Sequence, residues 1–119
     1  MTRAIPPAEI APEEFFTRWL PAAVSADPER VRRLGETDAT LEFELTGEGG
    51  GLFHLRIEGG RVRGFVGAAQ DASLRVRVDL ESWRELNAGT LSAPMALLRR
   101  RIHLHGNLAL AVKLHLIIG

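Results

Sequence analysis

The pattern of hydrophobic and polar residues changes period near residue 40. Before that point apolar side chains recur at helical spacing, and an aromatic face at residues 15–20 marks a helix that starts at Pro12. Beyond it, apolar and polar residues alternate, as is typical of strands that bury one face. The alternating segments are residues 41–45, 53–58, 61–66, 73–78 and 102–104.

Turns and caps complete this division into elements. Short connections, among them the two-residue turn Gly59-Gly60, make the first three strands an antiparallel meander. The first helix should kink at Pro21, and Asp27, Asp79 and Ser92 are expected to cap later helices. The result is an α+β prediction: two layers, with a five-stranded, mainly antiparallel sheet and helices covering one face.

The last helix, residues 108–118, is apolar on nearly every side, and only Lys113 and His115 interrupt it. A helix of this kind needs cover on more than one side. It reaches roughly 17 Å, too short for a bilayer core of about 30 Å. A sheet should lie beneath it, and another helix, a second subunit or an apolar ligand above it. Gly106 is expected to fix its start in a conformation that suits a residue without Cβ.

Composition and charge narrow the function classes. The 119 residues fit one domain at 12–119, preceded by a loose arm at 1–11 that contains Pro6-Pro7. Zero net charge gives no support for nucleic-acid binding, and the absence of Cys excludes disulfides, thiol catalysis and thiolate metal sites. The first residues hold no apolar run, so we expect neither signal peptide nor anchor, and a cytoplasmic location by default.

Candidate chemistry is sparse. His54, His103 and His105 should lie on outward strand faces, where a metal would need a third ligand from another strand. The glycines at 47–51 join two strands and lack the Lys-Ser or Lys-Thr of a phosphate loop. We therefore expect no enzyme, no cofactor and no metal. The outward charges should pair across strands; they are Arg56, Arg61, Arg63, Arg75 and Arg77 with Glu42, Glu44 and Glu58.

Four segments, taken in order, carry a family resemblance. They are Phe15-Phe16 with Trp19-Leu20-Pro21, then Leu41 to Gly51, then Asp71-Ala72 with Leu74-Arg75-Val76 and the following Trp83, Leu86 and Gly89, and finally Ile102 to Leu114 with Gly106-Asn107. Together they resemble the sterol carrier protein 2 (SCP2) sterol-binding domain family in its bacterial single-domain form. The resemblance implies a cavity between sheet and helices for fatty acid, acyl-CoA, sterol, phospholipid or isoprenoid, with no catalysis. Members commonly have a Gly just before the last strand, where this chain has Arg99-Arg100-Arg101.

These observations predict a non-enzymatic domain that binds, or also transfers, a hydrophobic ligand. The residues expected to line its cavity lie on inward faces of the last strand and its covering helices: Phe16, Trp19, Trp83, Leu86, Met95, Leu98, Ile102, Leu104, Val112 and Leu116. The apolar pattern taken alone slightly favours an ordinary core, and the family resemblance reverses that preference in favour of a cavity.

Two expectations concern partners. The basic group of Arg99, Arg100, Arg101 and Lys113 should make transient contact with an anionic membrane, while the last helix acts as a gate. The alternative is an interaction module whose last helix packs statically, either in a homodimer or on an enzyme of lipid or quinone metabolism.

Overall fold

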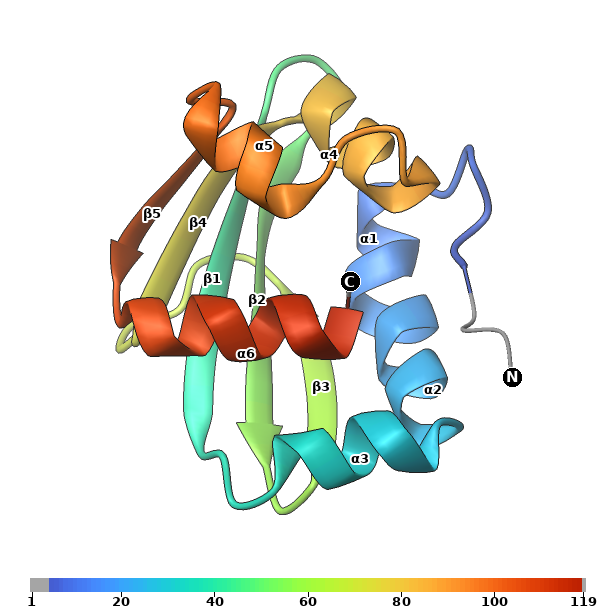
Figure 1. Ribbon diagram of the computed structural model, residues 1–119, viewed down its shortest axis with the longest axis vertical. Coiled ribbons are helices and arrows are strands. Elements are labelled where there is room, and N and C mark those ends of the chain that lie inside the picture. Colours follow the sequence, from blue (N-terminus) through green and yellow to red (C-terminus); the bar gives the residue numbers. More distant parts are fainter. Residues whose placement is uncertain (1–4, 119) are drawn as a thin grey trace.

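The computed structural model describes residues 5–118, with side chains described for residues 5–115 (Figure 1). The N-terminal half begins with helices and continues into a meander. Its elements are α1 (Pro12–Glu14), η1 (Phe15–Trp19, a π-helical turn), α2 (Leu20–Ser25), α3 (Pro28–Leu34), β1 (Ala39–Thr46), β2 (Gly51–Glu58) and β3 (Arg61–Val66). The rest comprises β4 (Leu74–Asp79), α4 (Leu80–Ala88), α5 (Ala93–Leu98), β5 (Ile102–Gly106) and α6 (Leu108–Ile118).

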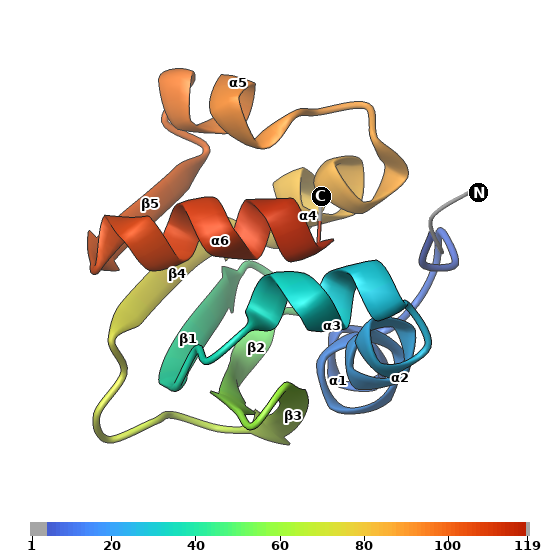
Figure 2. The ribbon, with the colours of Figure 1, turned by 60° about the horizontal axis from the view of Figure 1, so that its bottom comes forward.

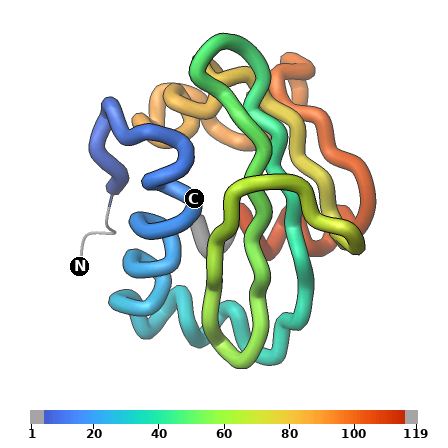
Figure 3. Tube along the Cα trace, turned by 180° about the vertical axis from the view of Figure 1, so that it is seen from behind, coloured from blue at the N-terminus to red at the C-terminus, as the bar shows by residue number. Residues whose placement is uncertain are grey.

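The five strands form one sheet in the order β3-β2-β1-β4-β5. Three of its four pairings are antiparallel, and the exception is β1 with β4, which run parallel with Leu41 opposite Leu74. The helices lie on one face of the sheet, and the other face is open when the molecule is seen from behind (Figures 1 and 3). The predicted α+β fold, with a mainly antiparallel five-stranded sheet and helices over one face, is confirmed.

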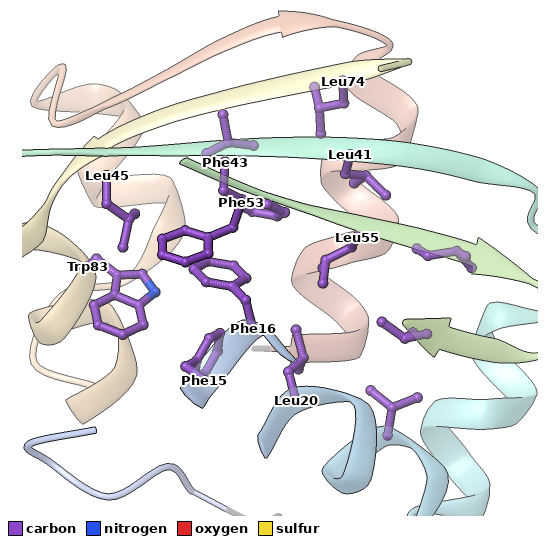
Figure 4. Packing of buried hydrophobic residues seen from close by; sticks show 14 of the residues in the cluster. Phe15, Phe16, Leu20, Leu41, Phe43, Leu45, Phe53, Leu55, Leu74 and Trp83 are labelled. Carbon is purple, nitrogen blue, oxygen red and sulfur yellow. The ribbon is translucent and has the colours of Figure 1, made fainter. Parts of the chain in front are cut away.

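Aromatic rings fill the centre of the space between the sheet and the N-terminal helices (Figure 4). The centroid of the Phe16 ring lies 4.9 Å from that of the Phe43 ring and 5.0 Å from that of Phe53, on which Phe16 stacks. The rings of Phe15 and Trp83 are nearly perpendicular, with their centroids 5.2 Å apart. Burying one large apolar side chain contributes about 1.5–3 kcal/mol, so this cluster fixes the N-terminal helices and α4 against the sheet.

The segments α1, η1 and α2 follow one another directly in sequence, and α1 and α2 overlap in Figure 2, which views this N-terminal helix nearly end-on. The wide turn is closed by the Leu20 N–H, which donates to the Phe15 carbonyl five residues back. Pro21 has no N–H and its ring crowds the carbonyl four residues earlier, so widening the turn relieves the clash. The kink expected at Pro21 is therefore a π-helical turn.

The outer face of the sheet carries the cross-strand ion pairs that the alternation indicates. Arg75 Nε lies 3.2 Å from Glu42 across β4 and β1, and Arg63 Nη2 lies 3.8 Å from Glu58 across β3 and β2. Each such exposed pair contributes up to about 1 kcal/mol. This face is therefore a solvated surface, and the apolar layer with its cavity lies on the helical side.

Candidate functional site

A cavity of about 580 Å³ lies between the sheet and the helices. Strands β1, β4 and β5, the aromatic turn η1, α3, α4 and α6 all contribute to its wall, together with the connection from α4 to α5. The lining residues are Ile5, Pro6, Phe15, Phe16, Trp19, Arg30, Phe43, Val76, Val78, Trp83, Leu86, Asn87, Ala88, Gly89, Leu91, Ser92, Ala93, Ile102, Leu114 and His115. Most of these side chains are apolar and only a few are polar, as in sites for hydrophobic small molecules.

The cavity extends from the core to the surface. Phe16 and Val78, which line it, are buried at 1% and 4% exposure, whereas Ala88, Gly89 and His115 are exposed. Its outer end therefore lies between the α4–α5 connection and the later part of α6. This opening is on the helical side of the sheet.

A polar network holds α4 at the cavity wall. Asp79 caps the helix by accepting from the Ser82 N–H at 2.9 Å, and the Ser82 hydroxyl donates to the second Asp79 oxygen at 2.5 Å. Arg101 Nε donates to Ser82 Oγ at 2.8 Å, and its guanidinium also pairs with Glu85. The hydrogen bond from the Ser82 hydroxyl holds the pKa of Asp79 below its ordinary value. The network ties the start of β5 to α4, which carries Trp83 and Leu86.

The N-terminal segment closes another side of the cavity. Arg84 Nη1 donates to the carbonyls of Ala8 at 3.2 Å and Ile10 at 3.1 Å, and Ile10 is buried. Ile5 and Pro6 lie at the cavity wall. The described part of the arm that was expected to be loose, residues 5–11, is thus held against α4.

Arg30 is a buried charge on the cavity wall. It is 1% exposed, projects from α3, and its Nε lies 3.6 Å from Asp27 Oδ2. Arg30 was not among the residues expected at the cavity, although it precedes the buried Leu34 by one helical turn and so shares its inward face. Arg30 gives the mostly apolar wall of the cavity a cationic position.

Half of the residues expected to line the cavity do so: Phe16, Trp19, Trp83, Leu86 and Ile102. Leu104 is partly buried and packs on the core beside the cavity rather than on its wall. The inward placement expected for three others does not hold, because Met95, Leu98 and Val112 are exposed at 38%, 77% and 63%. The side chain of Leu116 lies outside the described residues.

The difference lies in which side of α5 and α6 turns inward. α5 buries Ala96, and α6 packs through Leu110, Ala111 and Leu114, of which Leu114 reaches the cavity. Residues 108 and 112 therefore form the outward stripe of α6. Three sheet residues that were not expected at the cavity also line it, although their alternation placed them on the inward face: Phe43, Val76 and Val78.

The four basic residues expected to form one group near α6 lie in different surroundings in the structure. Lys113 Nζ donates to Thr37 Oγ1 at 2.7 Å, which links α6 to the connection between α3 and β1, and Arg101 belongs to the α4 network. Arg99 and Arg100 are exposed at the end of α5.

A second hollow, of about 640 Å³, lies between the β1–β2 turn and α4. Its wall carries Glu48, Asp79, Glu81 and Glu85, so it is not suited to a hydrophobic molecule. Among the described residues no group of three or more His, Asp or Glu side chains could hold a metal ion. Within the same part of the chain, no helix has the length and apolar character needed to cross a membrane.

The sequence model of the SCP-2 sterol transfer family matches residues 16–118. The chain belongs to this family. The match covers β1–β5 and the last helix, and so includes most of the cavity wall. Membership confirms the SCP2 resemblance carried by the ordered segments of the sequence.

Three similar proteins differ in how much of their own length this chain covers. Hydroxysteroid dehydrogenase-like protein 2 of Bos taurus is 31% identical over 80 residues, which are 66% of this chain and 19% of that protein. The solution structure of palmitated SCP2L2 from Aedes aegypti matches with a TM-score of 0.70 at 23% identity, covering 88% of this chain and 92% of that one. The sec-alkylsulfatase Pisa1 from Pseudomonas sp. matches with a TM-score of 0.68 at 19% identity, over 92% of this chain and 16% of that one.

The two structural likenesses fall below 25% identity and establish the fold alone. The chain spans less than a fifth of the length of the curated relatives that it matches.

Proposed function

We propose that this SCP2 domain binds a hydrophobic molecule in the cavity between the sheet and the helices and catalyses no reaction on it. The observation that carries the proposal is the apolar cavity of about 580 Å³, which extends from the core to the surface. Each methylene group moved from water into such a site contributes about 0.8 kcal/mol. A long acyl, sterol or isoprenoid skeleton therefore provides the binding energy without specific polar contacts.

The polar positions of the wall favour a ligand with an acidic head. Arg30 places a buried positive charge at the cavity, and contacts between guanidinium and carboxylate or phosphate are among the stronger hydrogen bonds in proteins. Apolar walls discriminate weakly between chains that differ by a methylene. We therefore infer selection by head group, with fatty acids or acyl phosphates preferred over neutral alcohols.

Two neighbouring positions on α6 provide the test. Leu114 lines the cavity, whereas Val112 is 63% exposed, so Leu114→Asp places a charge in the site and Val112→Asp places the same charge in solvent. In titrations with a fluorescent fatty acid, Leu114→Asp should weaken binding at least tenfold, while Val112→Asp keeps the wild-type affinity. Leu86→Asp and Met95→Asp form a second pair of the same design on α4 and α5.

Circular dichroism melts identify any variant that fails to fold, and the second pair then replaces it. The proposal is wrong if the wild-type protein takes up no acyl, sterol or isoprenoid probe. It is equally wrong if the cavity variants fold and bind as tightly as their surface partners.

A protein-interaction module is the second candidate, and the exposed apolar side chains of α5 and α6 favour it. Size-exclusion chromatography with light scattering separates the two. A tight dimer that takes up no ligand supports the interaction module, and a monomer that binds the probe supports the carrier.

A further inference from the structure

The first described residues of the chain form a strap along α4. Residues 5–11, called the N-terminal strap below, precede α1 and lie beside α4 (Figure 1). Arg84 Nη1 holds the strap there by donating to the carbonyls of Ala8 and Ile10. The Ile10 side chain is buried with the core. The strap lies ahead of residues 16–118, the part of the chain that the family model matches.

The N-terminal strap separates the apolar cavity from the acidic hollow beside α4. Ile5 and Pro6 line the cavity, whereas Ala8 and Glu9 line the acidic hollow. Ala88, at the end of α4, lines both. If the strap moved away from α4, the apolar cavity would therefore open toward carboxylates and water.

Ile5 is a large apolar side chain that is exposed although it lies on the cavity wall. Its exposed fraction is 68%, whereas the deeper wall residues Phe16 and Val78 are buried. Moving an apolar side chain of this size out of water is favourable. A hydrophobic ligand in the cavity would cover Ile5 and so gain a contact from the strap.

Arg84 also connects the strap to the aromatic part of the cavity wall. Its guanidinium carbon lies 5.6 Å from the centroid of the Trp83 ring, within the range of a cation–π contact. Trp83 is buried, lines the cavity and packs against Phe15. The same guanidinium therefore contacts a wall residue and holds the strap across the adjoining side of the cavity.

We propose that the N-terminal strap retains the bound ligand, with Ile5 and Pro6 as further ligand-contacting residues and Arg84 as the residue that positions them. The inference rests on the proposed ligand-binding function and adds a step to it, the opening of the strap before ligand leaves. The hydrogen bonds from Arg84 to Ala8 and Ile10 favour the closed position, and their modest net strength allows it to open. Because ligand touches Ile5 only when the strap is closed, bound ligand shifts the strap toward that position.

Stopped-flow dissociation of a fluorescent fatty acid from the purified protein tests the strap. Ile5→Ser removes the apolar contact and should weaken binding about fivefold, mainly through faster dissociation. Val66→Ser is the matched control, because Val66 is 59% exposed on β3 and is not on the cavity wall, and this variant should release ligand at the wild-type rate. Arg84→Ala should accelerate dissociation by a factor similar to that of Ile5→Ser. Arg84→Lys keeps a charged donor and should restore part of the retention.

A double variant distinguishes positioning of the strap from a general loosening of the fold. If Arg84 acts by holding Ile5 in place, Arg84→Ala already removes the Ile5 contact. Ile5→Ser combined with Arg84→Ala should then release ligand no faster than the faster single variant. Rates that multiply in the double variant would show that the two residues act independently, and the strap would be wrong. Dissociation from Val66→Ser as fast as from Ile5→Ser overturns it as well.

The wild-type protein keeps this test separate from that of the proposed function. If it takes up no acyl, sterol or isoprenoid probe, the carrier and the strap are both rejected. If it binds the fluorescent fatty acid and the Ile5 and Arg84 variants release it at the wild-type rate, the strap alone is rejected and the carrier stands. Circular dichroism melts show which variants fold. Ile5→Ser and Val66→Ser change exposed side chains, so their comparison decides the matter even where Arg84→Ala does not fold.

Discussion

Arg100 has a backbone φ of 58°, the one positive φ among the described residues other than glycine. It ends α5 in a pattern in which the Arg101 N–H donates to Ala96 and the Arg100 N–H donates to Leu97. Such helix ends place their left-handed residue at this position, where glycine is favoured because it has no Cβ. The strained residue lies within Arg99-Arg100-Arg101, the segment in which the family resemblance implies a glycine.

Replacing Arg100 by glycine should stabilise the protein. A left-handed residue with a side chain costs about 1–2 kcal/mol, and the greater freedom of glycine in the unfolded chain offsets part of that gain. We expect Arg100→Gly to raise the free energy of unfolding in urea by up to about 1 kcal/mol. Arg99→Gly is the control, because Arg99 has a φ of −86° and gains nothing from glycine. Equal stability of the two variants would contradict the explanation.

Asp79 should make the protein sensitive to acid. The Ser82 hydroxyl lowers the pKa of Asp79 in the folded protein. The ionised carboxylate therefore contributes its full stabilisation above the pKa of the unfolded state, about 3.9, and this stabilisation is lost as the pH falls through the lower pKa of the folded state. Asp79→Asn keeps a capping oxygen and should lose less stability than the wild type below about pH 4. Asp79→Ala removes the cap and should cost about 1 kcal/mol at neutral pH. Urea unfolding from pH 3 to 7 measures the stability of both variants. If the wild type and Asp79→Asn lose stability equally as the pH falls, Asp79 is not the source of the acid sensitivity.

Among the elements, the π-helical turn η1 depends on a glycine in β3. A Cβ at Gly64 would lie 1.8 Å from the Phe16 carbonyl oxygen, so the helix backbone rests directly on the strand. That close approach presses Phe16 into the aromatic centre and places Trp19 at the cavity wall. Pro21 and Gly64, 43 residues apart in sequence, jointly determine this corner of the site.

Gly64→Ala should therefore destabilise the fold more than the addition of a single methyl group usually does. Either β3 or η1 must shift, and overpacking of this kind costs about 1–3 kcal/mol. The neighbouring Arg63→Ala removes an exposed side chain and should change the free energy of unfolding by no more than about 0.5 kcal/mol. Thermal and urea unfolding of the two variants decide the matter; a Gly64→Ala protein as stable as Arg63→Ala would show that the close contact is unimportant.

Across the whole molecule, periodicity predicted the layers and the sheet face, but not how the last helices are rotated. Strand alternation shows which side chains point inward, and the structure follows it. A helix that is apolar all round has no polar face to orient it, so Met95, Leu98 and Val112 could not be distinguished from inward residues. The parallel pairing of β1 with β4 could not be predicted either, because the alternation along a strand indicates which face is buried and not which strand lies beside it. Arg30 was not expected at the cavity because charged side chains usually lie at the surface, in contact with solvent.

That parallel pairing has a consequence for how the chain is made on the ribosome. β1 lies inside the sheet between β2 and β4, yet its second partner begins only at Leu74, eight residues after β3 ends. The meander of β1, β2 and β3 can form as soon as it emerges, with one edge of β1 still lacking its hydrogen-bonding partner. At the usual rate of synthesis the residues up to the end of β4 follow about one to three seconds later. During that interval a strand that carries Leu41, Phe43 and Leu45 on its apolar face is open to pairing with other nascent chains.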